Sequence, residues 1–192
     1  MSKSTSVFFL DVDGVLNSAK TGWYCWDKYT VNWIIWLAKM SNSKFVISST
    51  WRKYHDYNFF NEILKDLVHD DWRTVSLYKD INGNRIPRGQ EIKQWLENHP
   101  EIKQYIIFDD DTDILEEQQS FFINTDSNEG TLFEHLIKAR DILNIKTFPD
   151  SEVLHMYHHP IMDGEKWYWD MQEIKHATKN NRKINLKRNM GE

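Results

Sequence analysis

Carboxylates and hydroxyls gather at three points along the chain, each directly after a short apolar run. The three clusters are Asp11-Val12-Asp13-Gly14, Ser48-Ser49-Thr50 and Asp109-Asp110-Asp111-Thr112-Asp113. Converging carboxylates repel one another, and a hard divalent cation such as Mg²⁺ offsets that repulsion. Beside such an ion one carboxylate can stay ionised as a nucleophile, and another, two residues later, can carry a proton. The acids therefore indicate a magnesium site with nucleophilic and acid–base chemistry.

Hydroxyls and a cation complete this set of groups. Ser48 and Ser49 can donate hydrogen bonds to an anion, and Arg88 opens an expected helix, where its charge adds to the positive end of the helix dipole. Together these groups are typical of a phosphoryl-transfer centre. Arg52 could reach a substrate phosphate or base, and a surface role fits the sequence equally well.

Each cluster also has a purely structural interpretation. The first pair of aspartates could form a hydrogen-bonded turn, and the serines could cap a helix, with or without a second role in phosphate binding. Arg88 could form a surface salt bridge with Glu91 or Glu97. The acids at 109–113 could form a solvated loop.

The apolar runs around the clusters predict the elements that position them. Residues 7–10, 44–47, 105–108 and 121–123 are expected to be buried strands, and helices are expected at about 27–40, around Phe59 to Leu67, at 88–97 and at 131–143. The alternation of strands and helices predicts an α/β fold, a Rossmann-like parallel sheet with helices on both faces. The carboxyl ends of neighbouring parallel strands face one crevice, so the fold would bring Asp11 and Asp109 together.

Length and composition limit the remaining possibilities. The chain has 192 residues, 40% of them apolar and 28% charged, which suits one globular domain. A net charge of -5 argues against a generally basic nucleic-acid-binding surface. The single cysteine, Cys25, excludes an internal disulfide or a cysteine-cluster zinc site. Without an apolar run of about 18 residues, we expect a soluble, cytoplasmic protein with no membrane association and no disulfide-linked partner.

A change of composition marks the end of the core. We expect a core over residues 1–149 and a C-terminal extension over 150–192, docked on the core, which is first rich in His and aromatic residues and then basic. His155, His158 and His159 could bind zinc, although histidines of this spacing more often pack or face solvent. The basic end could contact phosphates or be a solvated helix face.

Several of these segments together resemble a known family. FFLDVDGVLN, VISSTWR, IPRGQEIKQWL and YIIFDDDTD resemble the four motifs of the haloacid-dehalogenase-like (HAD) phosphohydrolases, in order and each at an expected strand end or helix start. The resemblance covers about residues 7–143. With INTD and GTL further on, the chain is similar to the HAD domains of RNA-repair-associated proteins and of phage polynucleotide kinase-phosphatases. The resemblance implies a HAD-like fold with a small or absent cap.

The resemblance also implies catalytic roles. Asp11 would attack phosphorus and become an aspartyl-phosphate, while Asp13 would protonate the leaving oxygen and then activate water. Arg88 would hold the phosphoryl group together with Ser48 or Ser49, and it stands where the family more often has lysine. Of the two serines, Ser48 is favoured because it directly follows the strand.

The same resemblance implies an Mg²⁺ site. Its ligands would be the carboxylates of Asp11 and Asp110 and the backbone carbonyl of Asp13, and Asp109 would lie close by. The run of acids leaves open which of Asp109, Asp110 and Asp113 touches the metal.

The expected function is Mg²⁺-dependent hydrolysis of a phosphomonoester through an aspartyl-phosphate. The partner would be a phosphorylated small molecule or, preferably, a nucleotide or nucleic-acid end, with a 3′-phosphate as one candidate. The aromatic residues after the first motif, Trp23, Tyr24, Trp26 and Tyr29, could stack on a nucleobase or pack in the fold. Alternatives are a catalytically idle phosphate- or nucleic-acid-binding module and a phosphotransferase.

Overall fold

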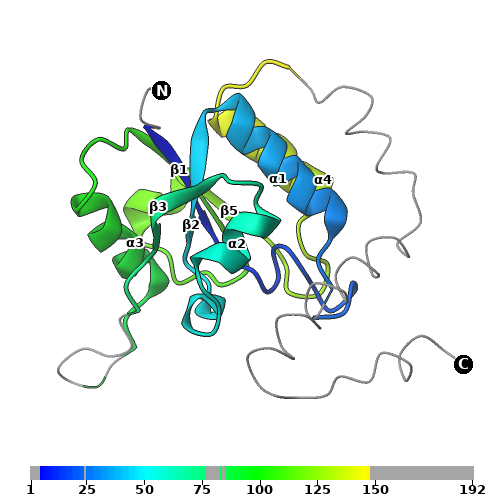
Figure 1. The fold of residues 1–192 in the computed structure, drawn as a ribbon, viewed down its shortest axis with the longest axis horizontal. Helices are drawn as coiled ribbons and strands as arrows, with labels where there is room; N and C mark the ends of the chain where they lie inside the picture. The colour runs from blue at the N-terminus through cyan, green and yellow to red at the C-terminus, as the bar shows by residue number, and fades with distance from the viewer. Residues whose placement is uncertain (1–4, 24, 77–82, 84, 148–192) are drawn as a thin grey trace, which may run out of the picture.

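The computed structural model describes residues 5–23, 25–76, 83 and 85–147. The C-terminal extension, which includes His155, His158 and His159, and the side chain of Tyr24 therefore lie outside the described residues. Five parallel strands form one sheet in the order β3-β2-β1-β4-β5, and Figure 1 shows them between the helices. The expected α/β fold with a parallel sheet is confirmed.

The strands have a buried centre and short or polar edges. They are β1 (Ser6–Leu10), β2 (Ser43–Ile47), β3 (Val68–Arg73), β4 (Gln104–Asp109) and β5 (Phe122–Asn124). All five residues of β1 are buried, as expected for a central parallel strand covered on both faces. Leu10 pairs with Ile47 on one side and with Phe108 on the other, so β1, β2 and β4 end level with one another.

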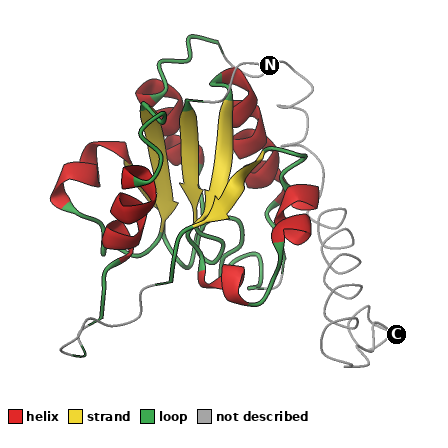
Figure 2. Cartoon of the chain, turned by 60° about the vertical axis from the view of Figure 1, so that its left-hand side comes forward, coloured by secondary structure: helices red, strands yellow, loops and turns green. Residues whose placement is uncertain are grey.

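Helices cover both faces of the sheet, as Figure 2 shows. On one face lie α1 (Lys28–Met40), α2 (Tyr57–Ile63) and α4 (Phe133–Ile142), which share a core with inward residues such as Phe8 and Phe108. On the other face α3 (Arg88–Glu97) packs Ile92 and Trp95 against Phe9. This division follows from the alternation of side chains along each strand.

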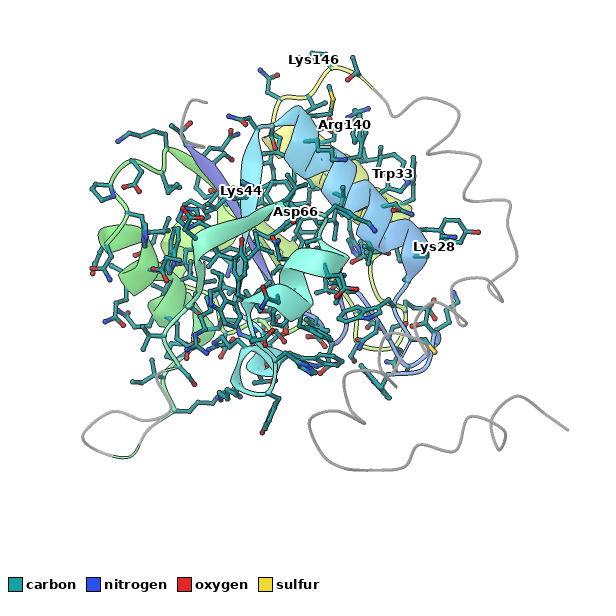
Figure 3. The ribbon with its side chains drawn as sticks, in the orientation of Figure 1. Lys28, Trp33, Lys44, Asp66, Arg140 and Lys146 are labelled. Atoms are coloured by element: carbon teal, nitrogen blue, oxygen red, sulfur yellow. The ribbon has the colours of Figure 1, made fainter. Side chains whose placement is uncertain are left out.

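Individual side chains fix the ends and contacts of these elements. Asp27 caps α1 by accepting hydrogen bonds from two backbone amides of its first turn. Trp33 of α1 is fully buried and meets Phe133 of α4 edge to face, with ring centroids 5.6 Å apart. The Lys44 Nζ donates to the Asp66 carbonyl at 2.7 Å and so ties β2 to the turn before β3; the two residues lie side by side in Figure 3.

Strand β3 was not among the expected strands. Only Val68 is fully buried in it, and Asp70 and Asp71 are exposed, so its sequence lacks the apolar run that marks the other strands. Between β1 and α1 the described residues form turns without a helix or strand, which agrees with a small or absent cap. Within the described part of the chain, none of the helices combines the length and apolar character that a bilayer span requires.

Candidate active site

Three acids from two strand ends meet at the carboxyl edge of the sheet. Asp11 follows β1 and donates its backbone N–H to the Phe108 carbonyl of β4 at 2.9 Å. One carboxylate oxygen from each of Asp11, Asp109 and Asp110 lies within 4.8 Å of the others. The level ends of β1 and β4 thus bring together acids that are far apart in the sequence.

The environment of these acids suits a hard cation. Asp109 is fully buried, and among the described residues its Oδ2 makes no hydrogen bond of regular geometry, although the Arg88 guanidinium lies close to it. Burial and the neighbouring Asp11 raise the pKa of Asp109 well above its ordinary value. The same two causes, with Asp111, raise the pKa of Asp110 to about 6. An all-oxygen set of crowded, desolvated carboxylates fits Mg²⁺.

Arg88 is the cation that the described structure places at this cluster. Its Nη1 lies 3.0 Å from Asp11 Oδ2 and 3.1 Å from Asp109 Oδ2, and it donates to the Ser48 carbonyl at 3.1 Å. Burial acts to lower the pKa of Arg88, but the surrounding carboxylates outweigh it and raise that pKa. The surface salt bridge considered for Arg88 is wrong, because its side chain is only 9% exposed and faces the acids.

The two serines after β2 have different surroundings. Ser49 Oγ accepts a hydrogen bond from the Trp51 amide at 3.3 Å and caps a short 3₁₀ turn, η1 (Thr50–Lys53). Ser48 is fully buried, and its Oγ has no partner within the described ranges of the chain. The capping interpretation therefore fits Ser49, whereas the buried Ser48 hydroxyl is left without a hydrogen bond among the described residues.

Arg52 lies beneath this loop and is 4% exposed, so the expectation of a surface role is wrong. Its guanidinium pairs with Glu91 at 2.6 Å and donates to the backbone carbonyls of Ser48, Ser49 and Thr74. Burial lowers the pKa of Arg52. Four of its five N–H donors bind these groups, so Arg52 braces the loop that carries the serines, and the expected direct contact with substrate has no support in this geometry.

Asp13 is held apart from the three clustered acids. Its Oδ1 accepts a hydrogen bond from Asn17 Nδ2 at 2.9 Å, and its Oδ2 accepts one from Trp51 Nε1 at 2.8 Å. The group of three acids that could hold a metal does not include this carboxylate, and a role for the backbone carbonyl of Asp13 stays a prediction. Asn17 and Trp51 were not identified from the sequence, although both stand inside the motif segments.

Asp113 and Trp26, which also lie near the site, have structural partners. Asp113 accepts the Arg88 backbone N–H at 3.1 Å and so holds the start of α3, outside the group of three acids. Trp26 is 2% exposed and packs against Trp51, which favours packing over nucleobase stacking for this residue. Trp23, unlike Trp26, is not packed into the core, because it is 40% exposed.

A comparison with protein families gives a match over most of the chain. The model of the HAD domain in Swiss Army Knife RNA repair proteins matches residues 7–135. The chain belongs to this family. Neither the search of curated proteins nor that of solved structures finds a match.

Membership of the HAD family supports a phosphatase-type hydrolase for this domain. HAD domains generally use Mg²⁺, and the oxygen cluster of Asp11, Asp109 and Asp110 in this HAD domain could bind such an ion.

The raised pKa of Asp110 gives a prediction for stability. Its value of about 6 in the folded domain lies above the ordinary 3.8, so the folded state binds this proton more tightly than the unfolded chain does. This contribution to the free energy of unfolding is complete below about pH 4 and is lost as the pH rises through about 6. Mg²⁺ should replace the proton, so the melting temperature at pH 7.5 should rise by several degrees on adding Mg²⁺, and less at pH 5.

Thermal unfolding with Mg²⁺ or EDTA at both pH values measures this effect. Asp110→Asn should remove most of the Mg²⁺-induced gain. An equal gain at pH 5 and pH 7.5 would contradict the prediction.

Gly14 is required by the close approach of Asp110. Its φ is +72°, and a Cβ on it would lie 2.4 Å from the Asp110 Cγ. Gly14→Ala should therefore displace Asp110 and weaken Mg²⁺ binding about tenfold or more, measured by calorimetric titration. Gly22→Ala is the matched control, because φ is +77° there but the nearest atom lies 4.0 Å away. Equal Mg²⁺ affinity in the two variants would count against the role of Asp110 as a ligand.

Proposed function

We propose that this HAD domain hydrolyses phosphomonoesters with the help of Mg²⁺, through an aspartyl-phosphate on Asp11. The observation that carries the proposal is the meeting of Asp11, Asp109 and Asp110 within 4.8 Å, with Arg88 at 3.0 Å from Asp11. A nucleophile, a cation site and a fixed positive charge are then within reach of one phosphoryl group.

The residues suit a two-step reaction. Asp11 forms a bond to phosphorus while the bond to the leaving oxygen breaks, and that oxygen takes a proton from Asp13. A water molecule then attacks phosphorus and gives a proton back to Asp13, the bond to Asp11 breaks, and inorganic phosphate leaves. Mg²⁺ held by the three acids would offset the negative charge of nucleophile and phosphoryl oxygens.

Two groups are suited to hold the transferring phosphoryl group. Ser48 has a buried hydroxyl without a partner in the described structure, directly after β2. Arg88 is kept charged by its carboxylate neighbours and supplies further N–H donors. Arg52 and Arg88 both donate to the Ser48 carbonyl, which fixes the loop in place before substrate arrives.

For the substrate, we propose a nucleotide or nucleic-acid end, with a 3′-phosphate as the first candidate. The matched family occurs in RNA repair proteins. The described residues between β1 and α1 also build no helix or strand that could cover the strand ends, which would let a bulky substrate approach.

A phosphate-release panel tests both parts of this proposal. It compares mononucleotides, 3′-phosphorylated oligonucleotides, phosphosugars and ADP-ribose phosphates, each with Mg²⁺ and with EDTA. We expect Mg²⁺-dependent release with the highest kcat/KM for a 3′-phosphorylated oligonucleotide. No preference for nucleotide compounds would overturn the substrate, and tight binding without release would instead identify an idle binding module.

A further inference from the structure

The Asp13 carboxylate is held at both of its oxygens. Trp51 Nε1 donates to Oδ2 at 2.8 Å, and Asn17 Nδ2 donates to Oδ1 at 2.9 Å. The Asn17 amide is itself fixed, since it also donates to the Trp23 carbonyl at 2.7 Å. Two donors from different loops therefore define both the place of this carboxylate and the plane in which it lies.

The Trp51 ring is locked by an aromatic cluster that consists of Trp26, Trp51, His55 and Phe59. The ring stacks on His55, with centroids 5.1 Å apart and planes 22° apart, and lies 5.3 Å from Trp26 and 6.2 Å from Phe59. Trp26 comes from the loop after β1, and Phe59 belongs to α2. The indole cannot turn away from Asp13 without breaking this packing.

We infer that Trp51, assisted by Asn17, is a positioning residue that aims the Asp13 carboxylate at the leaving oxygen. The indole N–H only donates, so it can orient Asp13 but cannot take its proton. Each carboxylate oxygen has about two lone-pair sites, so one on each oxygen remains for proton transfer. This inference rests on the proposed function, in which Asp13 exchanges a proton with the leaving group and then with water.

Loss of the Trp51 hydrogen bond should affect substrates with poor and good leaving groups differently. Departure of a poor leaving group, such as the benzyl alcohol of benzyl phosphate, needs the proton from Asp13. Departure of 2,4-dinitrophenolate does not, because that anion is stable without a proton. Since kcat/KM reports the steps up to the first irreversible bond cleavage, loss of the Trp51 hydrogen bond should lower kcat/KM for the first substrate alone.

The test compares Trp51→Phe with the wild-type protein on these two substrates in Mg²⁺. Phenylalanine keeps an aromatic ring in the cluster but has no N–H. We expect kcat/KM for benzyl phosphate to fall about tenfold or more, and that for 2,4-dinitrophenyl phosphate to change by less than about twofold. With the second substrate a burst of dinitrophenolate should precede a slower steady state, because Asp13 must still activate water.

Two further variants distinguish positioning from a structural role. Trp72→Phe makes the same exchange at a partly buried tryptophan of β3 and should leave both substrates unchanged. Asn17→Leu removes the other donor and should repeat the leaving-group dependence, even if Trp51→Phe fails to fold. Equal losses on both substrates in Trp51→Phe and Asn17→Leu would overturn the inference. No release from either substrate by the wild-type protein would instead refute the proposed function, and the inference with it.

Discussion

Asp11→Asn should reduce the Mg²⁺-dependent turnover of an aryl phosphate by about 10⁴-fold or more. An amide has nearly the shape of the carboxylate but cannot supply the anionic oxygen that attacks phosphorus. The phosphate-release rate of purified variant and wild-type protein measures the effect. Acid-quenched wild-type protein should also carry a phosphoryl group that the variant lacks.

Asp111→Asn is the matched control for this prediction. It removes one negative charge beside the cluster, from a side chain that is 58% exposed and pairs with Arg85 at 3.4 Å. Its turnover should stay within about twofold of wild type, because exposed ion pairs contribute little. Unchanged turnover in Asp11→Asn would remove Asp11 as the nucleophile.

Arg88→Met should lower the free energy of unfolding of the metal-free protein by about 3–5 kcal/mol. The guanidinium lies 3.0 Å from Asp11 and 3.1 Å from Asp109, both of which are buried, so its removal leaves two crowded carboxylates without a cation. Methionine fills much of the same volume, which limits the contribution of a cavity. Urea unfolding in EDTA measures the loss.

Mg²⁺ and a lysine variant separate charge from packing at this position. Mg²⁺ should restore part of the lost stability, because it supplies positive charge at the same carboxylates. Arg88→Lys should lose less stability than Arg88→Met, because it keeps the positive charge. It should still be less stable than the wild-type protein, because an ammonium group cannot reach Asp11, Asp109 and the Ser48 carbonyl as one planar guanidinium does. A loss below about 1 kcal/mol in Arg88→Met would show that this ion pair is not needed for stability.

The central elements of the fold could be predicted because they are buried on both faces. β1, β2 and β4 carry uninterrupted apolar runs, and α3 begins at Arg88 and ends at Glu97 as expected. β3 could not be found in this way, because only Val68 is buried and three of its six residues are exposed. Its strand conformation depends on pairing with β2, which leaves no periodic apolar signal in the sequence.

The candidate site was predictable where it depends on strand ends. The sequence places Asp11, Ser48 and Asp109 directly after apolar runs or at their ends, and the parallel register brings them level. The partners of the arginines were not predictable, because they depend on how loops fold over one another. The hydrogen bond from Trp51 to Asp13 has the same origin: it joins two loops through the packing of side chains far apart in the sequence.

In the described part of the chain, both margins of the sheet have features that hinder pairing with a strand of another molecule. An outermost strand offers unpaired backbone groups, which can recruit a strand of another molecule. On one margin, β3 presents the exposed Asp70 and Asp71 and then Arg73, while on the other β5 has only three residues. A second copy approaching β3 would meet like charges, and β5 offers too short a template for lasting pairing. Replacing Asp70 and Asp71 by valine would remove both charges and raise the tendency of this strand to pair with another chain.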